Sequence, residues 1–419
     1  MTVAGPLLSI NNYYYRRSGA EVMFFGHNEL FSRHGWDVAS FAMRHPKNLP
    51  SEFSPYFVDE IEYGQTYSPM GSISRAAKVI YSTEARRKLK ALIKDYPVSI
   101  AHCHCIYHHI SPSILGTLQE LGIPVVMTLH DLKIACPAYF MHRNSVPCDA
   151  CRGGHFRQVV RHRCIKGSFA LSSVVYLEST LHKLLGSYTD KIQAYVSPSQ
   201  FYIDLLIDWG FPAELFHHVP NFLDASGVPR NQRVGAHFGY VGRLSKEKGV
   251  HLLIEAAALA NVPVKIAGDG PEQDTLQRLA KERQADVEFV GVLDHDGVLN
   301  FMAACRATVV PSIWYENCPM TVLESFAACT PVIGAAIGGV PELIEPGFHG
   351  ELFEVGNVSA LAGQLAKLAG TDKGAMAEMV QAARDRVEQS YSPQRYYSAM
   401  QSVYDQVRHL RWRRGICRR

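Results

Sequence analysis

The sequence contains no apolar run that approaches the roughly 18 residues needed to cross a bilayer, and it has no internal repeat and no low-complexity segment. Its start, MTVAGPLLSINNYYYRR, lacks the charged-then-apolar order of a secretion signal. No Gly-x-Gly-x-x-Gly follows the first predicted strand, which argues against a Rossmann-type oxidoreductase. From these absences we expect a cytoplasmic protein without a membrane span.

The cysteine content and the charge distribution indicate the redox compartment and the kinds of partner to expect. Ten cysteines occur among 419 residues, but several lie in core-like segments and nothing indicates an oxidising compartment, so we expect mostly reduced, buried thiols. The net charge of +3 is unevenly distributed, because the last twelve residues carry six arginines and no acid. We expect no nucleic-acid partner.

Short β-rich apolar runs alternate with stretches of helical length, which is the pattern of parallel sheets with crossover helices. The length exceeds the usual size of one hydrophobic core. Strands are predicted at 7–10, 37–41, 98–103, 124–129, 192–196, 236–241, 264–267, 287–290, 308–310 and 331–334. Helices in the first half are predicted at 20–34, 75–94, 112–121 and 169–187. A polar stretch at 224–234 is predicted to link two α/β domains, residues 1–222 and 232–390.

Two glutamates in the last third of the chain indicate a ligand site. In the run WYENCPMTVLESFAACTPVIGAAIGGVPELI, Glu316 follows a strand-like segment and Glu324 lies in the next predicted helix, of which Pro319 is expected to be the first residue. Parallel α/β sheets bind ligands at the carboxyl ends of their strands. Two carboxylates there suit the hydroxyls of a sugar and a ribose. On an isolated helix, the same pair would be solvated surface charges.

This run resembles the signature of retaining glycosyltransferase family 4, in which two glutamates separated by seven arbitrary residues contact a nucleotide-sugar donor. The resemblance implies the GT-B fold, with two Rossmann-like domains facing across a cleft, an acceptor-side domain first and a nucleotide-sugar-binding domain second. It also implies that a C-terminal helix at about 393–410 crosses back to the first domain. Donor contacts are implied for Glu316, Asn317, Cys318, Pro319, Met320 and Glu324.

A second donor segment is HFGYVGRLSKEKGVHLLIEA. It places Gly242 and Arg243 at the end of a predicted strand and Lys248 at the start of the next helix, so cations and helix-terminal N–H groups converge where a diphosphate would lie. In family 4 the matching arginine and lysine grip the diphosphate. Without the resemblance, the segment would be an ordinary basic loop.

Glycines and one apolar position complete the donor side. Gly268 and Gly270 form a tight turn that the family places beside the nucleotide, although a turn is also needed to reverse the chain. Backbone near Val292 is expected beside the base. The family usually has two adjacent glycines before the first long helix, whereas this chain has Ser18 and Gly19, so Gly19 takes the donor contact.

Histidines mark the acceptor side. His130 and Asp131 follow the strand at 124–129, and such a pair is often only a cap or turn. The resemblance to the family's Thr-Leu-His-Asp element implies that His130 contacts the transferred sugar and that Asp131 orients it or binds acceptor. His108 and His109 lie at another strand exit and are also assigned to the acceptor side.

Four cysteines lie in an insertion at 136–164. Cys136, Cys148, Cys151 and Cys164 include one Cys-x-x-Cys pair. In a reducing compartment this number and spacing fit a structural zinc site. The alternative is four unligated or redox-active thiols.

These observations predict a retaining, metal-independent glycosyltransferase that moves a sugar from a UDP- or GDP-sugar to a glycan or lipid-linked acceptor in surface polysaccharide or glycoconjugate biosynthesis. The catalytic assignments are His130, Arg243, Lys248 and Glu316. No Asp-x-Asp occurs where one would hold a divalent ion against the diphosphate. The alternatives are a sugar-nucleotide epimerase of the same fold and a non-catalytic nucleotide-sugar-binding homologue.

Two basic segments suggest peripheral contact with an anionic membrane surface. One is the tail at 408–419, where Leu410 and Trp412 lie among arginines, and the other is the basic helix predicted at 75–94. The alternative is that both are solvated charged faces.

Overall fold

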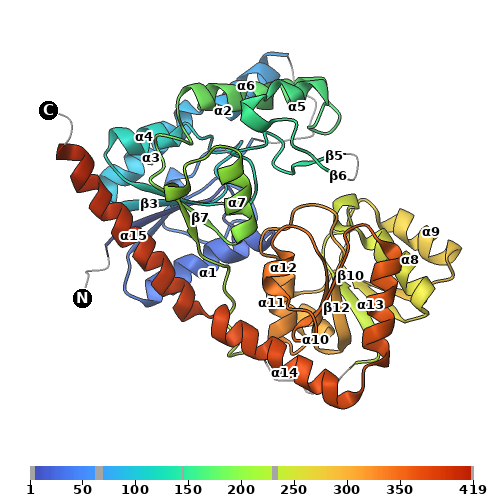
Figure 1. The fold of residues 1–419 in the computed structure, drawn as a ribbon. Coiled ribbons are helices and arrows are strands. Elements are labelled where there is room, and N and C mark those ends of the chain that lie inside the picture. Colours follow the sequence, from blue (N-terminus) through green and yellow to red (C-terminus); the bar gives the residue numbers. More distant parts are fainter. Residues whose placement is uncertain (1–4, 62–68, 144–145, 229–234, 417–419) are drawn as a thin grey trace.

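A computed structural model describes residues 5–61, 69–143, 146–228 and 235–416. It contains two parallel six-stranded sheets, which confirms the predicted α/β class (Figure 1). The first sheet has the order β2-β1-β3-β4-β7-β8 and the second β11-β10-β9-β12-β13-β14. The first-sheet strands are β1 (Leu7–Ile10), β2 (Val38–Phe41), β3 (Ile100–Cys103), β4 (Val125–Thr128), β7 (Ala194–Ser197) and β8 (Phe216–His218). The second-sheet strands are β9 (His237–Val241), β10 (Val264–Ala267), β11 (Val287–Gly291), β12 (Cys305–Val310), β13 (Val332–Ala335) and β14 (Gly350–Phe353).

Helices connect the strands and cover the sheets. Those of the first half are α1 (Gly19–Arg33), α2 (Pro69–Ile80), α3 (Thr83–Asp95), α4 (Ile114–Glu120), α5 (Arg157–Arg161), α6 (Phe169–Leu184) and α7 (Gln200–Asp208). Those of the second half are α8 (Val250–Ala260), α9 (Gln273–Glu282), α10 (His295–Ala303), α11 (Met320–Ala327), α12 (Val340–Leu343), α13 (Val358–Gly370), α14 (Lys373–Ser390) and α15 (Pro393–Ile416). None of the described helices combines the length and hydropathy needed to span a bilayer.

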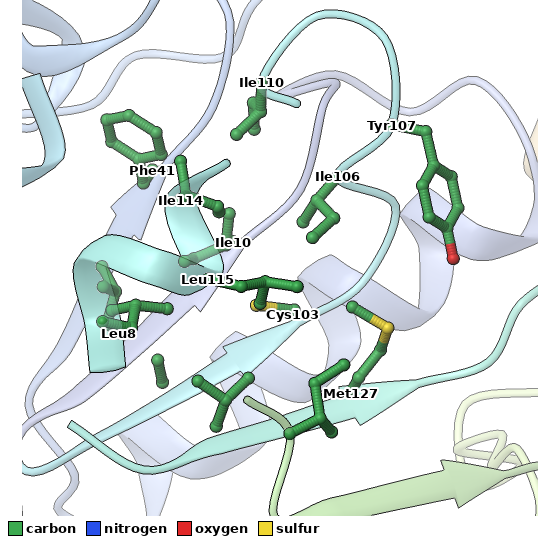
Figure 2. Close-up of a cluster of buried hydrophobic side chains, with 14 of the residues drawn as sticks. Leu8, Ile10, Phe41, Cys103, Ile106, Tyr107, Ile110, Ile114, Leu115 and Met127 are labelled. Atoms are coloured by element: carbon green, nitrogen blue, oxygen red, sulfur yellow. The ribbon is translucent and has the colours of Figure 1, made fainter. Parts of the chain in front are cut away.

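The strands of the first sheet are apolar because both faces of a parallel sheet are covered. All four residues of β1 are buried. Figure 2 shows part of the core that results, where strand residues Leu8, Ile10, Phe41, Cys103 and Met127 lie beside Ile106 and Ile110 of the loop after β3 and Ile114 of α4.

The strand order fixes where a ligand site can form. In the first sheet the chain reverses direction across the sheet between β1 and β3, and in the second between β9 and β12. Open α/β sheets bind ligands at such switch points, outside the carboxyl ends of the strands. The segments that follow β9 and β12 are those that carry Arg243, Lys248 and Glu316.

The last helix crosses from the second sheet back to the first, as predicted (Figure 1). In α15, the Tyr404 hydroxyl lies 2.6 Å from Nδ1 of His102, at the end of β3. Trp36 Nε1 donates to the hydroxyl of Tyr397, also in α15. These buried polar contacts fix the rotation of α15 as well as its position.

Some local predictions were wrong. The helix predicted at 75–94 is two helices, because α2 ends at Ile80 and Ser82 caps α3 by accepting a hydrogen bond from the N–H of Ala85. Pro319 is the N-cap of α11, not its first residue. Strands β8 and β14 were missed. Residues 229–234 of the predicted linker lie outside the described residues, and the domain boundaries stay predictions.

Candidate functional site

Glu316 is the most densely bonded carboxylate of the site. Only 7% of the residue is exposed, and its Oε1 accepts hydrogen bonds from Lys248 Nζ at 2.7 Å, Ser312 Oγ at 2.6 Å and Trp314 Nε1 at 3.0 Å. Burial alone would raise the pKa of Glu316, but the Lys248 charge and these hydrogen bonds together lower it. Among the described residues Oε2 has no hydrogen-bond partner, so an ionised oxygen is available to a ligand.

The backbone beside this pair holds Lys248 in place. Lys248 ends a 3₁₀ turn, η4 (Lys246–Lys248), and Gly249 follows with φ of 68°. A Cβ at Gly249 would lie 2.0 Å from the carbonyl oxygen of Pro311, after β12. The ammonium also lies 5.0 Å from the centre of the Trp314 ring. Glycine is therefore required for η4 to pack against the loop that carries Glu316.

Arg243 differs from Lys248 in having no acidic partner. It is exposed after β9, and among the described residues no carboxylate pairs with it. The Tyr240 hydroxyl donates to its carbonyl oxygen at 2.9 Å. Burial raises the pKa of Tyr139 in the insertion of the first half, and the charges of Asp131, Arg17 and Arg243 all act on that hydroxyl. Arg243 therefore lies close enough to the first domain for its charge to act on the Tyr139 hydroxyl.

Glu324 lies on α11 with its side chain half-buried. Burial raises its pKa, and the nearby His295 partly opposes this. No hydrogen bond to its carboxylate occurs within the described part of the chain. A desolvated acceptor without a donor suits a ligand hydroxyl, as expected for contact with a ribose.

The predicted glycine positions have packing reasons of their own. A Cβ at Gly268 would lie 1.9 Å from the carbonyl oxygen of Gly242, and one at Gly270 would lie 2.3 Å from that of Leu244. Val292 follows β11 and is 69% exposed. The two turns thus need glycine to reach each other, and contact with a nucleotide stays a prediction for these positions.

The first domain touches the donor loop at α11. A Cβ added to Gly19 would lie 3.4 Å from Cγ of Met320, so the N-termini of α1 and α11 meet here. The Ser18 hydroxyl, which stands where the family usually has glycine, donates to Glu21 Oε2 in the first turn of α1 at 2.6 Å. Two helix N-termini with their free N–H groups therefore lie at one place.

Asn317 and Cys318 connect the domains. Asn317 Nδ2 donates to the carbonyl oxygen of Leu129 at 2.7 Å and its Oδ1 accepts from Ser199 Oγ at 2.7 Å. Asn221 Nδ2 donates to the carbonyl oxygen of Cys318, whose own thiol is buried. The Asn317 side chain is thus occupied within the protein, and contact of residues 317–320 with a donor sugar stays a prediction.

His130 lies at the end of β4 as predicted, and it is joined to histidines that the sequence analysis missed. Its Nε2 lies 2.9 Å from Nδ1 of the buried His104, which stacks on His102 with ring centres 4.4 Å apart. His102 in turn contacts Tyr404, and that hydroxyl lies 3.0 Å from Nε2 of His27. Burial lowers the pKa of His130 to about 4 and holds the other three well below their usual value. The imidazole that reaches the site is therefore neutral.

Asp131 is the titratable carboxyl of the acceptor side. Burial raises its pKa to about 6, although the Lys133 backbone N–H donates to Oδ1 at 2.9 Å. The Lys133 ammonium is committed to a fully buried ion pair with Glu178 at 2.6 Å. Burial and the Lys133 charge lower the pKa of His108 to about 4, which places His108 near this pair. His109 instead bonds to the backbone N–H of Ile61.

The four cysteines of the insertion line one cavity of about 120 Å³. All four are free thiols. No three histidine, cysteine, aspartate or glutamate side chains in the described residues are already close enough together to hold a metal ion.

Comparison with known families gives two adjacent matches. Residues 17–226 match the model described as Glycosyltransferase Family 4, and residues 233–386 match the one described as Glycosyl transferases group 1. A glycogen synthase of Mycobacterium tuberculosis is 34% identical over 197 residues, which cover 44% of this chain and 47% of that protein. A GDP-mannose-dependent alpha-mannosyltransferase of Corynebacterium glutamicum is 30% identical over 39% of this chain and 41% of its own length. The chain spans about half the length of the curated relatives it matches.

Solved structures share the fold over the whole chain. Sucrose-phosphate synthase from Thermosynechococcus elongatus superposes with a TM-score of 0.69 at 19% identity, covering 96% of this chain and 98% of that one. HepE of Anabaena, solved with UDP and glucose, gives a TM-score of 0.66 at 18% identity and covers 96% and 99%. These neighbours confirm the GT-B fold.

Proposed function

Because the chain belongs to glycosyltransferase family 4, we propose that it transfers a sugar from a UDP- or GDP-sugar to a hydroxyl of a glycan or lipid-linked acceptor, with retention of the anomeric configuration. The observation that carries the proposal is the second-domain cluster of Arg243, Lys248 and Glu316 at the switch point between β9 and β12. An exposed arginine, a lysine paired with a buried carboxylate and two helix N-termini fit a diphosphate beside a sugar.

The proposed roles of these residues follow from the charges that develop on the diphosphate and the sugar during transfer. When the bond between the anomeric carbon and the diphosphate breaks, negative charge grows on the diphosphate oxygens and positive charge on the sugar. Arg243 and Lys248 stabilise the leaving group by electrostatics that need no rearrangement, a contribution typically worth several kcal/mol. Glu316 holds Lys248 at 2.7 Å and offers Oε2 to a sugar hydroxyl. We propose that this replaces a divalent cation in catalysis.

The first domain supplies the other partners. His130, being neutral, can exchange a hydrogen bond with a hydroxyl of the transferred sugar without adding charge beside the positive anomeric centre. Asp131, ionised above a pKa of about 6, accepts a hydrogen bond from the acceptor hydroxyl. We propose an acceptor of surface polysaccharide or glycoconjugate synthesis, because one relative, 28% identical over 166 residues, is named as a putative colanic acid biosynthesis glycosyltransferase of Salmonella typhimurium.

Donor screening tests this function. UDP- and GDP-sugars are first ranked by how much they raise the melting temperature, and the best donor is then incubated with and without candidate acceptors, without added divalent cations. HepE, solved with UDP-glucose, makes UDP-sugars the first choice. A new glycosidic product supports transfer. Conversion of donor to an epimer without acceptor indicates the epimerase, and binding without any turnover indicates the non-catalytic homologue.

We also propose that the protein works at an anionic membrane surface through α5 and α6. The basic helix predicted for this role is a poor candidate, because Lys88 pairs with Glu84 at 3.0 Å and Lys90 with Glu120 at 2.8 Å. The side chains of the tail from 409 onward lie outside the described residues.

Helix α6 presents the reverse of the usual amphipathic arrangement. Glu178 and His182 are buried on its inner face, while Phe169, Leu177 and Leu184 are 62%, 51% and 81% exposed. An exposed apolar stripe of this kind typically marks a membrane or partner contact. Beside α6, an open groove of about 460 Å³ is lined by Arg157, Arg161, Ser173 and Tyr176. Within the described residues neither arginine has an acidic partner, so the rim suits lipid phosphates.

Co-sedimentation with anionic vesicles at low salt tests the membrane contact. The double variant L177E/L184E is expected to lose most binding, and truncation after Val407 to reduce it. The matched control is Leu259→Glu on α8, which changes an equally exposed leucine (66%) of the other domain. Equal, negligible binding of wild type and variants would refute membrane contact, whereas a concentration-dependent dimer lost in L177E/L184E would assign the stripe to a second copy.

A further inference from the structure

The insertion at 136–164 has little apolar material with which to order itself. It contains a short hairpin of β5 (His142–Arg143) and β6 (Val146–Pro147), a 3₁₀ turn, η2 (Arg152–Gly154), and α5. Its nearly buried hydrophobic side chains are Ala138, Met141, Cys151 and Val159. Short segments with so small a core usually need a cross-link or a metal ion.

The cysteines converge although they come from separate parts of the insertion. Cys136 precedes the hairpin, Cys148 follows it, Cys151 precedes η2 and Cys164 follows α5, yet all four line the same cavity of about 120 Å³. Backbone N–H groups place two of them: Cys148 donates to the carbonyl oxygen of Met141 at 2.8 Å and Cys164 to that of Val159 at 3.0 Å. The backbone thus brings all four cysteines to one cavity.

The backbone of Cys136 is also held in place. Its N–H donates to the carbonyl oxygen of Leu132 at 2.8 Å, and its own carbonyl oxygen accepts from the N–H of Tyr139 at 2.7 Å. Fixed backbone around a ligand residue orients its side chain towards a metal ion. Four sulfur ligands in a tetrahedral arrangement select zinc among the common divalent ions.

We propose that Cys136, Cys148, Cys151 and Cys164 bind one structural zinc ion, which orders residues 136–164 beside the donor site. A Zn–S bond is about 2.3 Å, so the thiols, which now line the cavity, must turn inward around the ion. The ion then cross-links three loop segments that the small core leaves weakly joined, and its binding free energy becomes folding free energy of the insertion.

The insertion connects the proposed ion to the catalytic groups. The Phe140 ring packs on Trp314, with ring centres 5.6 Å apart, and Trp314 donates to Glu316. Lys133 Nζ donates to the carbonyl oxygen of Pro137 at 3.0 Å, which ties the start of the insertion to the buried ion pair. Zinc would therefore hold Phe140 and the adjacent Tyr139 at the boundary between acceptor and donor halves. It takes no part in the transfer chemistry.

Metal analysis of the full chain, purified without a metal-affinity tag or chelator, tests the proposal. We expect about one zinc ion per chain in the wild type and less than about 0.2 in Cys148→Ser and Cys151→Ser. The control is Cys305→Ser, which removes a buried thiol of the other domain but keeps a donor to the carbonyl oxygen of Phe301, and should retain the ion. Cobalt substitution of the wild type should give the visible spectrum of tetrahedral thiolate coordination.

A readout on the wild type alone covers the case in which cysteine variants fail to fold. Titration of native protein with a mercurial should release zinc to a coloured chelator only as the four thiols are consumed. Less than about 0.2 zinc per chain, with all four thiols reacting freely in the native state, would overturn the proposal. Zinc that stays bound in both Cys148→Ser and Cys151→Ser would equally contradict it.

Discussion

The donor half and the acceptor half of the site hold their polar groups in different ways. In the second domain Lys248 and Glu316 form a direct ion pair, and no carboxylate of the described residues pairs with Arg243. In the first domain, His104 and His130 are neutral and hydrogen-bonded to each other. Two cations fit a diphosphate whose charge grows during reaction, and neutral imidazoles fit sugar hydroxyls. The first domain also holds charge, in the Asp131 carboxyl and in the buried Lys133–Glu178 ion pair.

Removing a donor-half cation should have the largest effect. Arg243→Ala or Lys248→Ala is expected to lower turnover of the best donor by on the order of 10²-fold or more, because stabilisation of the leaving diphosphate is lost. The measurement is steady-state transfer or, without acceptor, donor hydrolysis. Lys246→Ala removes an exposed cation of the same 3₁₀ turn and should be nearly neutral. Wild-type turnover in Arg243→Ala would break the assignment.

Removing His104 should have a smaller effect that acts through His130. His104→Ala leaves His130 without its 2.9 Å partner, and we expect kcat to fall roughly tenfold because the imidazole is no longer held in place. Donor KM should change little, and His104→Asn should restore part of kcat by supplying a hydrogen-bonding amide. An increase in donor KM with unchanged kcat would show that His104 serves the structure of the donor site instead.

Replacing Glu324 by Gln (Glu324→Gln) should weaken donor binding more than it slows the chemical step. The Glu324 carboxylate has no hydrogen bond within the described residues, and burial raises its pKa. The glutamine amide has nearly the same shape but lacks the charged oxygen that would accept a hydrogen bond from the donor. We expect a donor KM about tenfold higher at nearly constant kcat, which is the signature of a contact present in both ground and transition states. A fall in kcat at constant KM would place Glu324 in the chemical step.

The acceptor half should show a pH dependence that the donor half lacks. Burial raises the pKa of Asp131 to about 6, so the carboxyl is neutral below that pH and ionised above it. If the ionised form binds acceptor, kcat/KM for acceptor should rise with pH through about 6, and Asp131→Asn should remove this limb. A limb that survives in Asp131→Asn would assign it to another group.

Stability should also fall on the acid side. Burial holds the pKa of His130 at about 4 and those of His27, His102 and His104 lower than usual. As pH falls, these four imidazoles therefore take up protons in the unfolded chain before they do so in the folded protein. Stability is therefore full above about pH 6.5 and is lost as pH falls towards 4, by up to about 1.4 kcal/mol per pH unit per histidine. Chemical denaturation across this range measures the slope, and His102→Asn should reduce it.

The two halves also differed in how far the sequence predicted them. Donor residues lie in two short segments, 242–248 and 316–324, whose strand-to-helix pattern places them at the carboxyl edge of a sheet. The histidine chain joins α1, β3, β4 and α15, and only tertiary packing brings such distant segments together. The only local sequence feature that pointed to this histidine chain was the alternation of His102 and His104 at the end of a strand. The break at Ser82 was missed because the helical pattern continues through it.

Titration calorimetry of UDP and GDP tests the division of the site most directly. The account predicts that wild type binds at least one of the two nucleotides, that Arg243→Ala weakens this binding by about tenfold or more through loss of a charged contact, and that Asp131→Asn leaves it unchanged. Nucleotide binding that is unaffected by Arg243→Ala, or abolished by Asp131→Asn, would contradict the placement of the donor beside the second-domain cations.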